Sequence, residues 1–232
     1  MTEPEDATPP TFLDRDRVGF PTTSETRRRI DTTAFTLDLT GVEGVLHWFD
    51  VFGNDHPVEL EVGSGKGLFL QNAATAEPSR NFVGVELAKM YARKAAERVA
   101  KHHLTNVRVW PGDAKRFLAR HVPSASLRGV HVYFPDPWWK ARHKKRRVFG
   151  EPLLADIERA LIPGGDLWIA SDVEEYHGVM RDLVLGNRRF ESRPWPDLKD
   201  AEHDLDYLTN FERKYRLEGR PIHRAYFVLR PL

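Results

Sequence analysis

Residues 134–147 combine three kinds of side chain that suit chemistry on a nucleic-acid base. Asp136 stands between two prolines, two tryptophans follow at once, and a dense run of lysines and arginines completes the segment. A carboxylate accepts hydrogen bonds from the N–H edge of a base, an indole stacks on its face, and cations neutralise the neighbouring phosphates. The segment therefore predicts a site that acts on a nucleic-acid base.

The two prolines give Asp136 a stiff setting. Each proline fixes its own φ and restricts the residue before it, and neither has an N–H that would compete for the carboxylate. The alternative interpretation is a proline-rich turn followed by a charged surface helix, which is the usual meaning of a charge run taken alone. Trp138 and Trp139 have the same two interpretations, since each indole either stacks on a base or fills a core. The features upstream of the segment decide in favour of the nucleic-acid site.

Short apolar runs alternate with amphipathic stretches from residue 57 onward. The repeated order of strand, helix and strand predicts an α/β fold with a mostly parallel, twisted sheet and helices on both faces. The predicted strands are 58–62, 82–86, 107–110, 130–134, 167–171 and 226–229. The predicted helices are 68–76, 89–102, 114–120, 151–160 and 173–185, with a short one at 45–49.

Length and composition limit the remaining choices. With 232 residues, 41% of them hydrophobic, the chain can bury one substantial core. We expect one α/β domain over residues 55–232 and an N-terminal extension over 1–54, disordered over its first ten residues. There is no cysteine, no long apolar run and no histidine in metal-ligand spacing with an acid. We therefore expect a cytoplasmic protein without a bound metal, either a monomer or a homodimer.

The ends of the predicted strands predict a cofactor site, because ligands of open α/β sheets bind beyond the carboxyl ends of the strands. The first strand runs through Glu61 into a turn with Gly63 and Gly65. Its Gly-x-Gly-x-Gly spacing differs from the spacing of dinucleotide-binding and phosphate-binding loops. Glu86 ends the second strand, where an acid commonly accepts from ribose hydroxyls. Asp113 follows the third strand and either accepts from an exocyclic amine or caps the next helix.

Together with Asp136, these acids would form an anionic rim. Such a rim repels a pyrophosphate, which disfavours a nicotinamide dehydrogenase. It suits a cofactor with hydroxyls, an amine and a positive sulfonium. S-adenosylmethionine fits this description.

Several segments together resemble the bacterial tRNA (guanine-N7)-methyltransferase family. They are Glu-Val-Gly-Ser-Gly-Lys-Gly at 61–67, Gly-Val-Glu at 84–86, Gly-Asp-Ala at 112–114, the segment 134–147, and Ala-Ser-Asp at 170–172. Their order and spacing fit from about residue 58 onward, and the block from Pro135 to Arg147 is the most specific of them. The resemblance implies a Rossmann-like class I S-adenosylmethionine-dependent methyltransferase that methylates N7 of a guanine in the tRNA variable loop.

The resemblance also implies roles for individual residues. The implied catalytic residue is Asp136, and the cofactor-binding residues are Glu61, Gly63, Gly65, Glu86 and Asp113. The implied substrate-binding residues are Lys140, Asp172, Thr209, Asn210, Phe211 and Glu212, and the RNA-contacting residues are Arg142, His143, Lys144, Lys145, Arg146 and Arg147. Asn210 departs from the family pattern, which has a lysine there. Thr209 and Glu212 also have capping-box spacing, and the alternative interpretation is that they only begin a helix.

Two other functions remain open on the sequence alone. A methyltransferase acting on a small molecule explains the strand ends but gives the basic run no purpose. A non-catalytic RNA-binding protein on the same fold explains the basic run but not the acidic rim.

Overall fold

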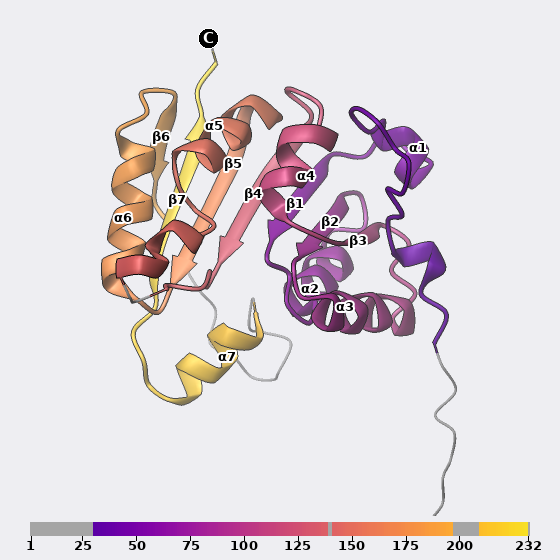
Figure 1. Cartoon of the computed structure of the whole chain (residues 1–232), viewed down its shortest axis with the longest axis horizontal. Helices are drawn as coiled ribbons and strands as arrows, with labels where there is room; N and C mark the ends of the chain where they lie inside the picture. The colour runs from indigo at the N-terminus through magenta and orange to yellow at the C-terminus, as the bar shows by residue number, and fades with distance from the viewer. Residues whose placement is uncertain (1–29, 139–140, 197–208, 232) are drawn as a thin grey trace, which may run out of the picture.

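The centre of the protein is a seven-stranded sheet in the order β3-β2-β1-β4-β5-β7-β6 (Figure 1). The computed structural model describes residues 30–138, 141–196 and 209–231. Strands β1 to β5 pair with one another in parallel, whereas β7 is antiparallel to both β5 and β6. The predicted mostly parallel α/β fold is therefore confirmed. The strands are β1 (Val58–Val62), β2 (Asn81–Glu86), β3 (Val107–Pro111), β4 (Leu127–Tyr133), β5 (Leu161–Ser171), β6 (Phe190–Arg193) and β7 (His223–Leu229).

Helices cover both faces of this sheet. One core contains side chains from α4 (Ala114–His121), α5 (Glu151–Ala160) and α6 (Glu174–Leu185). The core on the other face contains side chains from α2 (Leu68–Ala76) and α3 (Lys89–Lys101). The remaining helical segments are the 3-10 turns η2 (Thr33–Phe35) and η3 (Ala141–Arg146), and the helices α1 (Trp48–Phe52) and α7 (Asn210–Leu217).

The sequence Val-Glu-Leu-Glu-Val of β1 is buried along its whole length. Alternate side chains of a strand point to opposite faces, so its aliphatic residues join the core under α4–α6 and its acids face the other side. Glu59 is accommodated there by an ion pair to Arg80 at 2.7 Å and by His131 Nε2 at 2.8 Å. Burial opposes ionisation of Glu59, but His131 and Arg80 together hold its pKa below the usual value. This buried network lets a carboxylate occupy the middle of the sheet.

The structure differs from the predicted elements mainly at the sheet edge. Strand β6 was not predicted, because four residues with two charges among them give no clear alternation. Strand β5 begins at Leu161, directly after α5 and before the predicted start at residue 167, and the pairing with β4 shifts register in this early part. Strand β4 ends at Tyr133, one residue before its predicted end, because Phe134 takes a left-handed φ of 50°. Helix α1 begins three residues after the start of the short helix predicted at 45–49.

Residues 30–54 pack along the β3 side of the sheet (Figure 1). The Leu37 N–H donates to the Val109 carbonyl at 2.9 Å, and the Leu46 N–H donates to the His121 carbonyl at 2.8 Å. The first of these bonds and the bridge between Thr36 and Val109 give edge strand β3 a short backbone neighbour, which shields it from pairing with another chain. The predicted boundary at residue 54, between an N-terminal extension and the α/β domain, stays a prediction. Residues 1–10, which are predicted to be disordered, lie outside the described residues.

Candidate active site

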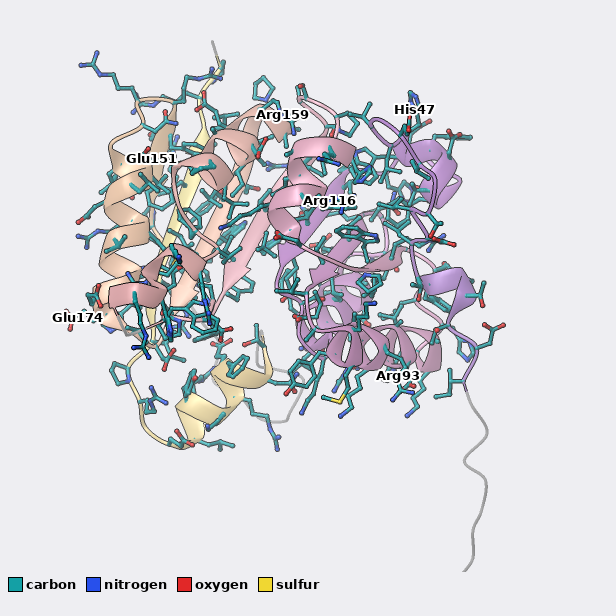
Figure 2. The ribbon with its side chains drawn as sticks, in the orientation of Figure 1. His47, Arg93, Arg116, Glu151, Arg159 and Glu174 are labelled. Carbon is teal, nitrogen blue, oxygen red and sulfur yellow. The ribbon has the colours of Figure 1, made fainter. Side chains whose placement is uncertain are left out.

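Strands β1, β2, β4 and β5 end at one edge of the sheet, here called the carboxyl edge. In Figure 1, α7 lies below this edge, on the side to which the arrowheads of β1 and β4 point. Figure 2 shows Arg93 on α3 and Glu174 at the start of α6 on opposite sides of the same region. The predicted site residues that the structure describes come from the turns at this edge and from α7.

The glycine turn after β1 is held by the backbone of β2 and by Glu86. Gly63 and Gly65 have φ values of 79° and 53°, a region that L side chains rarely adopt, and open space lies where a Cβ would be. The Glu86 carboxylate accepts from the Gly65 N–H at 2.9 Å and from the Ala88 N–H at 2.8 Å. The turn is thus fixed in a shape that leaves its outer surface free for a ligand.

Glu61 lies in β1 directly before this turn and has the least satisfied carboxylate of the site. Glu61 is only 3% exposed, and its Oε2 has no hydrogen-bond partner among the described residues. Burial raises the pKa of Glu61 well above the usual value, and the nearby charge of Glu86 adds to the rise. Ser64 Oγ, in the glycine turn, is likewise buried without a partner. Buried acceptors of this kind fit a ligand that brings amine or hydroxyl donors, as S-adenosylmethionine does.

Asp113 follows β3 and caps α4. Its Oδ1 accepts from the Lys115 N–H at 2.8 Å, so the predicted helix-capping contact is confirmed. The preceding Gly112 N–H donates to the Glu86 carbonyl at 3.0 Å, which ties this turn to the end of β2. Asp113 is otherwise exposed at the edge, and its predicted contact with the cofactor stays a prediction.

The Pro-Asp-Pro turn, residues 134–138, follows β4 and presents Asp136 to solvent. Phe134 and Trp138 flank the two prolines with φ values of 50° and 42°, which are uncommon for residues other than glycine. The Phe134 N–H donates to the Ala170 carbonyl at 2.8 Å and so joins the turn to β5. Trp139 and Lys140 lie outside the described residues.

Trp138 is half-buried against the basic run rather than fully packed in the core. The His143 ring meets it edge-on at 5.8 Å between centroids, and the Arg146 guanidinium lies 5.1 Å from its ring centroid. Arg142, Lys145 and Arg146 are exposed.

Arg147, the last residue of the predicted RNA-contacting segment, is buried, unlike the exposed cations before it. The side chain of Lys144 lies outside the described part of the structure.

Asp172 follows β5 and forms an ion pair with Arg220. The Arg220 guanidinium also lies 4.2 Å from the centroid of the Tyr215 ring. Burial raises the pKa of the Tyr215 hydroxyl, and the negative charge of Asp172 adds to the effect. Asp172 is therefore linked to α7 through these two side chains.

Helix α7 begins with the predicted capping contact and carries the remaining candidates. Thr209 Oγ1 accepts from the Glu212 N–H at 3.0 Å. Glu212 is buried and pairs with Arg224 of β7 at 2.7 Å. Phe211 is 49% exposed, and its ring lies 6.2 Å from that of Phe134 in the Pro-Asp-Pro turn. Asn210 is half-buried at the start of the helix.

Sequence reasoning missed the partners that fix these candidates in place. Arg220 and Arg224 are isolated arginines near the C-terminal strand, and no local pattern marks them. Only the antiparallel insertion of β7 beside β5 brings them to the carboxyl edge. Over the described ranges, no group of three His, Asp or Glu side chains is arranged to hold a metal ion. Over the same ranges, no helix is long and apolar enough to cross a membrane.

The fold, the glycine turn and the acidic carboxyl edge are those of a Rossmann-like, class I S-adenosylmethionine-dependent methyltransferase. Two solved structures share the fold. The 16S rRNA methyltransferase KamB matches with a TM-score of 0.56 at 16% identity, over 79% of this chain and 93% of that one. The aminoglycoside resistance methyltransferase NpmB1 matches with a TM-score of 0.52 at 19% identity, over 75% and 87%.

The sequence comparisons identify the family. Residues 55–225 match the family described as "Putative methyltransferase". The tRNA (guanine-N(7)-)-methyltransferase of Rhodopirellula baltica is 42% identical over 76% of this chain and 68% of its own length. The protein of the same name from Geobacter metallireducens is 33% identical over 85% of this chain and 92% of its own. The chain belongs to the bacterial tRNA (guanine-N7)-methyltransferase family, as its motifs predicted.

Proposed function

We propose that this protein transfers the methyl group of S-adenosylmethionine to N7 of a guanine in the tRNA variable loop. The observation that supports this most directly is the placement of an exposed Asp136 at the same edge as the buried Glu61, whose Oε2 has no partner within the described structure. One acid is free to meet a base, and the other is suited to a bound cofactor. The names of the relatives at 33–42% identity supply the substrate and the atom. A cytoplasmic location is proposed with it, since tRNA is its substrate.

The cofactor would lie along the glycine turn. When bound, S-adenosylmethionine supplies an electrophilic methyl group on a positively charged sulfur. Glu61 and Ser64 are the groups to satisfy its polar donors, and Glu86 holds the turn in shape while contributing negative charge. Asp113 would contribute its free carboxylate surface from the next turn.

Guanine N7 has a lone pair and no proton to lose, so the reaction needs no strong base. The protein must align N7 with the methyl carbon and stabilise the positive charge that develops on the base. Asp136 would accept from the N1–H and the exocyclic N–H₂ of the guanine. These donors become more acidic as the base becomes cationic, so the hydrogen bonds strengthen in the transition state.

The substrate side of the site would be formed by α7 and by Asp172. Phe211 offers an exposed ring beside Phe134, and Asp172 is held by Arg220. The buried Glu212–Arg224 pair would fix α7 in place, and Thr209 caps the helix. Asn210 and Phe211 are the first two residues of α7. Lys140 is assigned to the substrate by family resemblance alone.

The tRNA must expose its guanine to reach this site. The major groove of A-form RNA is too narrow to admit side chains, so the target base is unpaired or extruded when it reacts. The exposed cations of η3, with Arg142, Lys145 and Arg146 among them, would neutralise backbone phosphates beside it. His143 and Lys144 belong to the same run.

The test is methyl transfer from labelled S-adenosylmethionine to unmodified tRNA transcripts. A transcript whose variable-loop guanine is replaced by adenine serves as the matched control. We expect incorporation into the first transcript and none into the second. Incorporation into both would place the target elsewhere. No incorporation with cofactor still bound would favour a small-molecule methyltransferase, and no cofactor binding at all would favour a non-catalytic RNA-binding protein.

A further inference from the structure

Arg147 differs from the rest of the basic run in its surroundings. It is 9% exposed, whereas Arg142, Lys145 and Arg146 point to solvent. A phosphate-binding arginine needs an accessible guanidinium, and this one is covered on several sides. Its position in the sequence therefore suggests a different role from that of its neighbours.

The Arg147 guanidinium makes three different contacts at once. Its Nε donates to the carbonyl of Pro137, the residue after Asp136, at 2.7 Å. Its plane lies 4.4 Å from the centroid of the Tyr176 ring in α6. Its Nη atoms approach the Glu175 carboxylate at 3.4 Å. The side chain thus connects the Pro-Asp-Pro turn to the first turn of α6.

The backbone of Arg147 extends this connection to the cofactor side of the edge. Lys115 Nζ donates to the Arg147 carbonyl at 3.1 Å. The same lysine donates its backbone N–H to Asp113 Oδ1 at 2.8 Å. The turn with Asp113 is therefore joined to the turn with Asp136 by hydrogen bonds that run from Asp113 through Lys115 and Arg147 to Pro137.

The Pro-Asp-Pro turn needs such support because it has little means of holding itself. Phe134 and Trp138 keep left-handed backbone conformations, each of which costs on the order of 1 kcal/mol or more for a residue other than glycine. Pro135 and Pro137 have no N–H with which to bond to the surrounding structure. A conformation of this kind persists only when neighbouring groups impose it.

We propose that Arg147 is a positioning residue that fixes Asp136 relative to the cofactor turn, and that it is not a phosphate contact. The proposal rests on the proposed function, in which Asp136 meets the guanine. Misplacing a reacting group by about 1 Å can lower a rate by about 10²-fold while leaving binding unchanged. Loss of Arg147 should accordingly reduce kcat and spare tRNA affinity.

Lysine cannot replace arginine at this position. The planar guanidinium donates through Nε along one direction while its face lies on Tyr176 and its far end meets Glu175. An ammonium keeps the charge but has neither the flat face nor the second donor group. Arg147→Lys therefore removes the geometry of the contact and preserves its charge.

The experiment compares Arg147→Lys and Arg147→Ala with Lys145→Ala, an exposed cation two residues away. Steady-state methylation of tRNA gives kcat and KM, and tRNA binding at several salt concentrations gives the slope of log Kd against log salt. We expect kcat to fall by about 10²-fold in both Arg147 variants, with the salt slope and the tRNA Kd unchanged. In Lys145→Ala we expect a weaker Kd and a slope lower by about one.

Amide hydrogen exchange in the Pro-Asp-Pro turn provides a readout that does not depend on the reaction. The Asp136 and Trp138 amides should exchange faster in Arg147→Lys, while the thermal midpoint and the affinity for S-adenosylhomocysteine stay at wild-type values. If the wild-type protein does not methylate tRNA, the proposed function fails and this exchange comparison still tests the contact.

Two results would overturn the proposal. One is an Arg147→Lys or Arg147→Ala variant that keeps kcat but loses one unit of salt slope, which would make Arg147 a phosphate contact. The other is unchanged exchange in the turn together with a general loss of thermal stability, which would make it an ordinary structural residue.

Discussion

The carboxyl edge has a cofactor half, with the glycine turn, Glu86 and Asp113, and a substrate half, with Asp136, Asp172 and α7. Different kinds of contact hold each half in shape. In the cofactor half, acids bond to backbone N–H groups: Glu86 accepts from the glycine turn and from Ala88, and Asp113 accepts from Lys115. In the substrate half, side chains pair with side chains distant in sequence, as Asp172 does with Arg220 and Glu212 with Arg224. A backbone-defined site tolerates most side-chain changes, whereas a side-chain-defined site depends on each partner. We therefore expect the substrate half to be the more sensitive to single substitutions.

The largest effect is expected from Asp136→Asn in the substrate half. The amide keeps the shape of the carboxylate, but its N–H₂ group is a donor and cannot accept from the guanine N–H groups. It also has no charge to stabilise the cationic base. Loss of one such group typically costs about 10²–10³-fold in kcat. We expect a fall of about 10³-fold with tRNA Kd within about twofold of wild type, measured by single-turnover methylation and filter binding.

Asp182→Asn provides the matched control for this experiment, since Asp182 is an exposed acid of α6 that contacts Arg181. It should methylate tRNA at the wild-type rate. Near-normal turnover in Asp136→Asn would exclude Asp136 from the chemistry and leave the substrate half without a catalytic residue.

A smaller effect is expected from Glu61→Gln in the cofactor half. Removing the charge that the cofactor would satisfy should weaken S-adenosylhomocysteine binding by about 10²-fold in calorimetry, since charged hydrogen bonds are worth about 1.5–3 kcal/mol. Glu77→Gln, at an exposed position after α2, should bind normally. Unchanged affinity in Glu61→Gln would mean that the cofactor does not contact this carboxyl group.

The same Glu61→Gln variant should change the dependence of stability on pH. The folded-state pKa of Glu61 is raised, so its contribution to stability is present below the unfolded-state pKa and is lost as pH rises through the folded-state value. The variant should therefore lose less stability than the wild type between acidic and alkaline pH. Urea unfolding at several pH values measures this difference.

The smallest effect is expected from His177, which is buried in α6 of the substrate half. Burial lowers its pKa from 6.5 to about 4, and the nearby His223 and Arg181 add to the shift. The unfolded chain binds this proton first as pH falls, so the folded state loses stability between about pH 6.5 and 4. Between pH 7.5 and 5.5 the loss should be roughly 1–2 kcal/mol.

His177→Gln cannot take up this proton and should flatten the urea-unfolding profile over the same pH range. An equally steep profile in the variant would assign the acid sensitivity to other groups. The two halves should respond to acid in opposite directions, because the cofactor half should gain stability at low pH through Glu61 while the substrate half loses it through His177.

The cofactor half was largely predictable from the sequence, because its contacts are local. The glycine turn, Glu86 and the capping role of Asp113 follow from residues close in the chain or at neighbouring strand ends. Even there the buried strand predicted at 58–62 did not reveal how Glu59 is accommodated, since its partners Arg80 and His131 lie elsewhere in the chain. The five-residue alternation of β1 resembles a half-exposed strand, but the whole strand is buried and Arg80 and His131 provide partners for Glu59.

The substrate half was predictable in its residue types but not in their arrangement. Asp136 and the basic run were evident from composition and spacing alone. The burial of Arg147 was not, because a run of five lysines and arginines among residues 142–147 has no periodicity that singles out one of them. Its partner Glu175 lies 28 residues away, and only the packing of α6 beside the turn brings the two together.

The place of β7 in the sheet has a consequence for the order in which the protein can fold as it is synthesised. Residues His223–Leu229 enter between β5 and β6, so β6 has no sheet neighbour within the described structure until β7 has been made. Strands β1 to β5 can pair as they leave the ribosome, because each neighbour is already present. Arg224, the partner of Glu212, arrives only with β7. A growing chain can thus assemble its cofactor half early, whereas its RNA-modifying half must wait until β7 has emerged.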